Sequence, residues 1–133
     1  MKNESLFTMS NIRKCEICGN LISFIEDKGI PLICCGQEMT KVEVITGEEG
    51  FEKHKPVIDI TDNGILVKVG SITHPMDEEH YIVLIQILDG DKVIAGRKLK
   101  PGDKPEFEFK INKDNFKDLS ARAYCNKHGL WKS

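Results

Sequence analysis

The chain has 133 residues, a length typical of one domain or of one domain with a small appendage. Hydrophobic residues make up 40% and charged residues 30% of it, which is the composition of an ordinary globular protein. The formal net charge is −2 and no run of Lys and Arg exceeds two residues, which argues against a nucleic-acid partner. The longest apolar stretch is residues 81–88, far short of a membrane span, and the polar N-terminus lacks the apolar core of a signal peptide. We therefore predict a cytoplasmic protein without a membrane partner.

Residues 1–41 are predicted to form a polar tail, residues 1–11, followed by a small domain that carries four of the five cysteines. Met9 in the tail is a second candidate start site. Two short strands are predicted in the small domain, at residues 21–25 and 32–33. About thirty residues cannot build a stable core alone, so a domain of this size needs a metal, disulfides or a partner chain.

Residues 42–133 show β patterns throughout and are predicted to form a second domain. Apolar or alternating segments are separated by turn signals, such as residues 62–64 and 89–91. Near the end of the chain the alternation places Phe107 and Phe109 on one face of a strand. The predicted strands are residues 42–45, 57–60, 65–69, 81–88, 92–99, 105–111 and 120–124. This pattern favours an all-β domain, a seven-stranded β-sandwich of immunoglobulin-like size.

Four cysteines within 21 residues form the first candidate metal site: Cys15, Cys18, Cys34 and Cys35. An odd total of five cysteines without a secretion signal argues against a disulfide framework. Residues 15–19 form a C-x2-C-G knuckle, in which two thiolates can bind one ion. Gly19 lets the backbone turn its N–H groups toward the sulfurs. The adjacent Cys34 and Cys35 are unusual, because most structural zinc sites use a second C-x2-C, and neighbouring ligands strain the angle at the metal. Four thiolates suit zinc or iron, so a zinc ribbon and an iron site both fit the spacing.

The second candidate site combines the fifth cysteine with every histidine of the chain: His54, His74, His80, Cys125 and His128. His74 and His80 bracket one loop, while Cys125 and His128 form a C-x2-H-G knuckle. Structural zinc rarely takes five ligands, whereas imidazole nitrogens suit iron, copper and zinc. Four nitrogens roughly in a plane with one thiolate leave a position open opposite the sulfur, and such a thiolate donates electron density to the metal. The set therefore favours redox chemistry on a small molecule.

These motifs resemble those of the desulfoferrodoxins, the two-iron class of superoxide reductases, over nearly the whole chain. The resemblance rests on residues 14–20, 34–36, 52–54, 74–76, 79–82 and 124–132. It implies a rubredoxin-like iron on a desulforedoxin-like N-terminal domain, held by Cys15, Cys18, Cys34 and Cys35. It also implies a second iron on an immunoglobulin-like domain, with His54, His74, His80 and His128 around the equator and Cys125 axial.

The reaction that the resemblance implies is the reduction of superoxide by one electron and two protons to hydrogen peroxide, without dismutation. Lys53 would attract the anion and help protonate the product, and Glu52 would become the sixth ligand of ferric iron after the product has left. The N–H groups of Lys127 and His128 are expected to hydrogen-bond the sulfur of Cys125. The family suggests a rubredoxin-like electron donor, and a homodimer is expected because pairing would stabilise the small metal domain.

Three other functions fit parts of the pattern. A zinc-ribbon interaction module joined to a β-sandwich explains the clustered cysteines but not the four histidines and Cys125. A mononuclear metallohydrolase usually has three protein ligands and an activated water, so five ligands would crowd it. A pure electron-transfer protein fits the first site but not the open position at the second.

Overall fold

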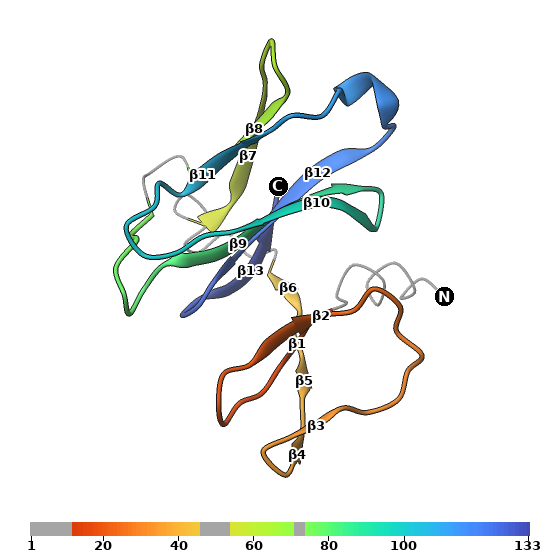
Figure 1. The fold of residues 1–133 in the computed structure, drawn as a ribbon, viewed down its shortest axis with the longest axis vertical. Helices are drawn as coiled ribbons and strands as arrows, with labels where there is room; N and C mark the ends of the chain where they lie inside the picture. Colours follow the sequence, from red (N-terminus) through yellow and green to blue (C-terminus); the bar gives the residue numbers. More distant parts are fainter. Residues whose placement is uncertain (1–11, 46–53, 71–73) are drawn as a thin grey trace. The chain divides into compact units, whose positions relative to one another are not determined.

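The structure is a computed structural model that describes residues 12–45, 54–70 and 74–133. The chain divides into two compact units, Met1–Glu43 and Val44–Ser133, and Figure 1 shows their strands. The described elements are β-strands and one short 3-10 helix, η1 (Lys113–Asn115), so the prediction of an all-β protein is confirmed. In the part of the chain that the structure describes, no helix has the length and apolar character needed to cross a bilayer.

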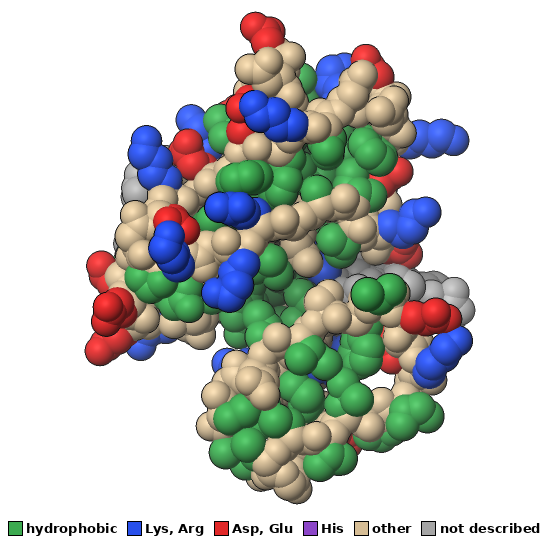
Figure 2. Space-filling view, in the orientation of Figure 1, with side chains coloured by type: hydrophobic (Ala, Val, Ile, Leu, Met, Phe, Trp, Pro, Cys, Tyr) green, Lys and Arg blue, Asp and Glu red, His purple; other side chains and the backbone are tan. Residues whose placement is uncertain are grey.

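The first unit contains a three-stranded antiparallel sheet, in the order β2-β1-β5, and a separate two-stranded hairpin, β3-β4. The strands are β1 (Ile12–Lys14), β2 (Leu21–Ser23), β3 (Ile33–Cys34), β4 (Gln37–Glu38) and β5 (Thr40–Lys41). Few apolar side chains are buried here; Ile12, Cys15 and Met39 are the buried ones among the described residues. Figure 2 shows hydrophobic side chains on the surface of this unit. A core this small agrees with the expectation that the unit needs a metal or a partner.

The second unit is a β-sandwich of a five-stranded sheet, β10-β9-β12-β13-β6, and a three-stranded sheet, β11-β8-β7. Its strands are β6 (Val44–Ile45), β7 (Pro56–Ile60), β8 (Ile65–Val69), β9 (Ile82–Asp89), β10 (Lys92–Lys98), β11 (Glu106–Phe109), β12 (Leu119–Cys125) and β13 (Gly129–Lys132). Neighbours are antiparallel except β13 and β6, which run parallel. One core of buried side chains from β8, β9, β11 and β12 joins the two sheets. The predicted β-sandwich is therefore confirmed, although its described residues form eight strands and not the predicted seven.

Local patterns explain the strands that were predicted well. β8 has the predicted bounds, with Ile65, Val67 and Val69 buried toward the core. Phe107 and Phe109 share a face as expected, with their ring centroids 4.9 Å apart. The prediction missed β13, because its four residues follow the second knuckle directly and are too few to show an alternating pattern.

The end of β12 is irregular at the point where it delivers a candidate ligand. Tyr124 pairs with Leu84, but Cys125 pairs with Ile82, so Val83 is an extra residue on β9. The carbonyl oxygen of Val83 accepts a hydrogen bond from the N–H of Leu99, 2.8 Å away. A bulge of this kind bends a strand and redirects the side chains beside it, which here include Cys125.

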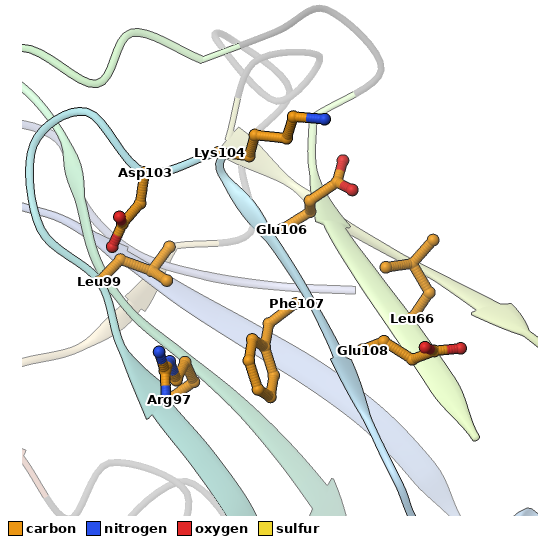
Figure 3. A pocket seen from close by; sticks show the side chains of 8 residues that line it. All are labelled: Leu66, Arg97, Leu99, Asp103, Lys104, Glu106, Phe107 and Glu108. Atoms are coloured by element: carbon orange, nitrogen blue, oxygen red, sulfur yellow. The ribbon is translucent and has the colours of Figure 1, made fainter. Parts of the chain in front are cut away.

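A surface pocket of about 530 Å³ opens in the second unit among residues of β8, β10, β11 and the connection from β10 to β11 (Figure 3). Its lining residues are Leu66, Arg97, Leu99, Asp103, Lys104, Glu106, Phe107 and Glu108. The guanidinium carbon of Arg97 lies 4.8 Å from the centre of the Phe107 ring. Charges of both signs line this pocket and none of the candidate metal ligands does.

Candidate metal centres

The four cysteines of the first unit come together as predicted. The sulfurs of Cys15, Cys18, Cys34 and Cys35 all lie within 4.8 Å of one another. The Sγ atoms of Cys18 and Cys34 are 3.6 Å apart. Thiolates at about 2.3 Å from one tetrahedral metal lie about 3.8 Å from each other, so this set fits the coordination of a single ion.

The first knuckle directs backbone N–H groups at the sulfurs. The N–H of Cys18 donates to Cys15 Sγ at 3.4 Å, and the N–H of Asn20 donates to Cys18 Sγ at 3.5 Å. Gly19 has a φ of 85°, a backbone conformation that residues with a Cβ rarely adopt. The predicted turn of the backbone at this glycine is therefore confirmed.

A tight turn explains how two adjacent cysteines reach the same place. Cys34 ends β3, and Cys35 and Gly36 form the two-residue connection to β4. Both turn residues have positive φ, 54° at Cys35 and 76° at Gly36, as a type I′ hairpin turn requires. The left-handed backbone at Cys35 thus separates the directions of the two side chains, at a cost typical of about 1–2 kcal/mol for a residue with a Cβ.

The pKa values of the clustered thiols shift in opposite directions. Hydrogen bonding from the backbone N–H of Cys18 is the main reason that the pKa of Cys15 falls to about 6. The pKa of Cys35 rises to about 12, chiefly through its hydrogen bond with Cys18 and then through the one with Cys15. One sulfur loses its proton readily while its neighbour resists a second negative charge. A metal cation would allow all four to ionise, because metal binding releases thiol protons.

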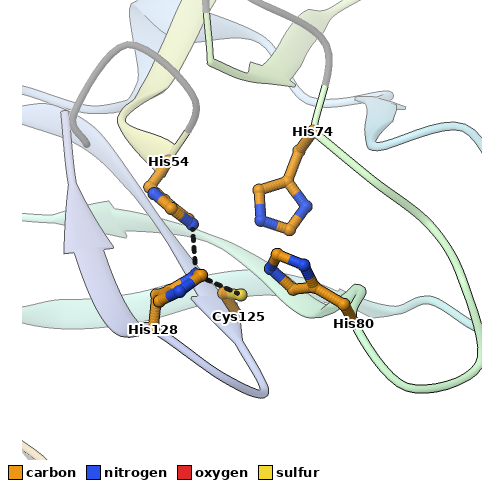
Figure 4. A group of neighbouring side chains, drawn as sticks. All are labelled: His54, His74, His80, Cys125 and His128. Atoms are coloured by element: carbon orange, nitrogen blue, oxygen red, sulfur yellow. Dashed lines mark hydrogen bonds between the residues drawn. The ribbon is translucent and has the colours of Figure 1, made fainter.

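Four imidazole rings of the second unit form a closed ring in the order His54, His74, His80, His128 (Figure 4). Neighbouring ring centroids are 4.7 to 4.9 Å apart, and neighbouring ring planes meet at 67° to 80°. The sulfur of Cys125 lies 3.7 Å from His128 Nδ1. One ligand atom from each of the five residues lies within 4.8 Å of all the others, so the structure unites the predicted set.

Different elements deliver these five side chains. His54 precedes β7, and His74 and His80 lie on the connection from β8 to β9. Cys125 ends β12, and His128 lies in the turn from β12 to β13. The set is therefore assembled by the sandwich, since the segments that carry it are far apart in sequence.

The donor atoms suit a metal ion. His74 Nδ1 lies 2.7 Å from the carbonyl oxygen of Pro75 and donates its hydrogen there, which leaves the lone pair on Nε2. That Nε2 atom is buried and has no hydrogen-bond partner among the described residues. Burial lowers the pKa of His74 to about 4, so the ring is neutral near pH 7. His54 Nε2 lies 3.1 Å from His128 Nδ1, close to the spacing of about 3.0 Å for adjacent nitrogen ligands of one metal.

Cys125, beside His128 in this cluster, is fully buried. Burial raises the pKa of its thiol, and hydrogen bonds from the backbone N–H groups of Lys127 and His128 lower it. The predicted pair of N–H groups is therefore present. In a metal-bound thiolate the same two hydrogen bonds draw electron density from the sulfur and moderate its donation to the metal.

Two residues beside the cluster were not singled out from the sequence. Trp131 stacks on His54, and Asn126 bridges two of the ligand-bearing segments. Both belong to the segment that follows Cys125, but their contacts depend on residues far away in sequence. Glu52 and Lys53, which the sequence analysis placed in catalysis, lie outside the described residues.

Comparison with known proteins gives matches along the chain. Residues 46–133 match the family model described as desulfoferrodoxin, and residues 8–42 match that of the desulfoferrodoxin N-terminal domain. A desulfoferrodoxin homolog of Archaeoglobus fulgidus is 48% identical over 92% of this chain and 94% of its own length. The desulfoferrodoxin of Nitratidesulfovibrio vulgaris is 45% identical over the same shares. The crystal structure of the superoxide reductase from Treponema pallidum aligns with a TM-score of 0.73 and 27% identity, covering 92% of this chain and 95% of that one.

Proposed function

Because the chain belongs to the desulfoferrodoxin family, we propose that it is a superoxide reductase. The reaction adds one electron and two protons to superoxide and yields hydrogen peroxide, without dismutation. The observation that carries this proposal is the closed ring of four imidazoles beside the buried Cys125, because this donor set suits a redox-active metal. The alternatives, a zinc-ribbon module and a pure electron-transfer protein, do not explain why four histidines surround one site.

Two non-haem iron ions fit the two donor sets. The first would be held by Cys15, Cys18, Cys34 and Cys35, and the second by His54, His74, His80, His128 and Cys125. Iron held by the second set would supply the electron for the reduction of superoxide. The protein sets the surroundings of that iron: the carbonyl oxygen of Pro75 fixes the tautomer of His74, burial keeps that ring neutral, and the backbone N–H groups of Lys127 and His128 limit donation from Cys125.

Lys53 and Glu52 complete the proposed catalytic machinery. They directly precede His54 in the sequence, which supports a place near the second centre. The ammonium group of Lys53 attracts the anionic substrate and helps to deliver a proton to the product. The carboxylate of Glu52 would serve as a further ligand for a metal held by this set once the product has left.

The proposed domain division is residues 1–41 and residues 42–133. It is supported by the two family matches, which meet between residues 42 and 46, and by the two compact units, which meet between Glu43 and Val44. We also propose residence in the reducing cytoplasm, which suits cysteines that bind metal and do not form disulfides.

We also propose a homodimer that pairs through the first unit. A rubredoxin-like protein is the proposed electron donor. Four isoleucines of the first unit are exposed by more than half: Ile17, Ile25, Ile30 and Ile33. Covering them would supply the apolar burial that this unit lacks by itself. Sedimentation of the full chain tests the pairing, and replacing these isoleucines by Ser or Lys would then yield a monomer.

Stoichiometry tests the proposed reaction. The reduced, iron-loaded protein is mixed with superoxide generated by pulse radiolysis, and peroxide and dioxygen are measured. A reductase forms one hydrogen peroxide for each superoxide consumed and releases no dioxygen, while the second centre is oxidised. Release of dioxygen with half the yield of peroxide would indicate a dismutase and overturn the proposal.

A further inference from the structure

Asn126 stands between two ligands of the second centre, Cys125 and His128, and its side chain contacts the segment that carries a third, His80. Its Oδ1 accepts a hydrogen bond from the N–H of Tyr81 at 2.9 Å. Its Nδ2 donates to the carbonyl oxygen of Glu79 at 3.0 Å. The backbone N–H of Asn126 adds a third hydrogen bond, to the carbonyl oxygen of Tyr81 at 3.2 Å.

These three hydrogen bonds hold the backbone on both sides of His80, because they involve the residue before it, Glu79, and the residue after it, Tyr81. The backbone of His80 itself is occupied by a different interaction. The N–H of Asp77 donates to the carbonyl oxygen of His80 at 2.9 Å, and the N–H of His80 donates to the carbonyl oxygen of Asp77 at 3.2 Å. The turn of residues 77–80 thus fixes His80 within its own loop, and Asn126 fixes that loop against the knuckle of Cys125 and His128.

We propose that Asn126 is a positioning residue that holds His80 in place relative to Cys125 and His128, and thereby sets how tightly the second centre retains its metal. The proposal rests on the proposed function only in that this cluster binds iron. An amide side chain suits this role because it offers a donor and an acceptor at once, with a rigid angle between them, and carries no charge. Residues that orient metal ligands commonly change metal affinity about 10- to 100-fold when they are replaced.

The side chain can be dissected one hydrogen bond at a time. Asn126→Asp keeps an acceptor for the N–H of Tyr81 and loses the donor to Glu79. Asn126→Ala loses both side-chain hydrogen bonds but keeps the backbone one. Asn112→Ala is a matched control, because Asn112 Oδ1 also accepts a backbone N–H, that of Asp114 at 2.9 Å, at the start of η1.

The experiment measures iron release from the iron-loaded full chain in the presence of EDTA, with the absorption of each centre followed separately. We expect release from the second centre to be about tenfold faster or more in Asn126→Ala and intermediate in Asn126→Asp. Asn112→Ala should match the unaltered protein, and the four-cysteine centre should release iron at the same rate in every variant. The sulfur-to-iron absorption band and the reduction potential of the second centre should shift in Asn126→Ala, which a merely structural role far from the metal would not cause.

Two results would overturn the proposal. One is retention of iron at the second centre of Asn126→Ala with the rate of the unaltered protein. The other is equal acceleration at both centres, which would indicate general destabilisation of the chain. If Asn126→Ala does not fold, an unchanged release rate and absorption band in Asn126→Asp decide against the proposal. No superoxide is added in this experiment. A failure of the proposed reaction would appear only in the stoichiometry experiment, where the unaltered protein would not react with superoxide.

Discussion

The indole of Trp131 lies nearly parallel to the imidazole of His54, with ring centroids 4.9 Å apart and an angle of 14° between the planes. The same indole donates its Nε1–H to the carbonyl oxygen of His128 at 3.0 Å. Trp131 is buried on β13, where it pairs with Ala123 of β12 on one side and Ile45 of β6 on the other. The side chain of Trp131 therefore contacts two neighbouring histidines of the four-histidine ring, His54 and His128.

The stacking and the hydrogen bond of Trp131 can be separated by substitution. Trp131→Phe keeps an aromatic face for His54 and loses the donor, whereas Trp131→Leu loses both. Aromatic pairs contribute about 0.5–1.5 kcal/mol, so we expect iron release from the second centre to be about two- to tenfold faster in the Leu variant than in the Phe variant. Chelator-induced release, followed by absorption, measures the difference. Equal rates in the two variants would show that the stacked ring does not stabilise the centre.

Replacement of the buried thiolate should distinguish the two centres. In Cys125→Ser the sulfur-to-iron band of the second centre should disappear and its potential should change, because an alkoxide or water donates electrons differently from a thiolate. The absorption of the four-cysteine centre should persist, since its ligands lie in the other compact unit. Metal analysis of the unaltered protein should give two irons per chain. Simultaneous loss of both centres in Cys125→Ser would contradict the division into two independent sites.

The ligand sets could be predicted from the sequence because ligand identity depends on residue type and short spacing. Two knuckles, Cys15 to Gly19 and Cys125 to Gly129, place both ligands of a pair within one turn. Strands such as β8 could be predicted for a similar reason, since a short run rich in apolar and β-branched residues after a turn signal is a local property.

Features that depend on distant contacts could not be predicted. The order of the imidazoles around their ring is set by the sandwich, which brings His54 beside His74 and His128. The left-handed backbone of Cys35 follows from the pairing of β3 with β4, and cysteine has no special preference for that conformation. The contacts of Asn126 and Trp131 likewise require partners from other strands.

The glycine in the β3–β4 turn should matter through its backbone alone. Gly36 has a φ of 76°, and a Cβ added there would meet nothing within 4 Å. Gly36→Ala should therefore destabilise the first centre by about 1–2 kcal/mol, the cost of a left-handed backbone for a residue with a Cβ. Gly36→Asn should cost less, because asparagine adopts this conformation more readily. Thermal loss of the absorption of the four-cysteine centre gives both values, and equal values for Ala and Asn would contradict the backbone explanation.

A buried arginine makes the sandwich sensitive to its hydrogen-bond partner. Arg122 on β12 is 1% exposed, and its Nε donates to Gln86 Oε1 on β9 at 2.6 Å. Burial lowers the pKa of Arg122 to about 10. Gln86→Leu should reduce the free energy of unfolding by about 1.5–3 kcal/mol, because the buried cation loses an acceptor. The double variant with Arg122→Met should lose less than the sum of the two single changes, which urea denaturation of all four proteins would measure.

Lys53 should act as an electrostatic guide for the substrate. Superoxide is an anion and the protein carries a net charge of −2, so a fast reaction needs positive potential close to the second centre. Local charge can raise association rates by about one to three orders of magnitude, and Lys53→Ala should slow oxidation of the ferrous protein by superoxide about tenfold or more. The dependence of the rate on salt should also become flatter, because the charge that salt screens has been removed.

Glu52→Ala is the matched comparison for this prediction, since it changes the neighbouring residue and its proposed role begins after the product has left. Its rate of oxidation by superoxide should stay close to that of the unaltered protein, while the absorption of its resting ferric state should change. Pulse radiolysis of both variants at several salt concentrations measures these effects. Unchanged kinetics in Lys53→Ala would identify Lys53 as an ordinary solvent-exposed lysine. A large decrease of the rate in Glu52→Ala would mean that the carboxylate, and not the ammonium group, acts in the first step.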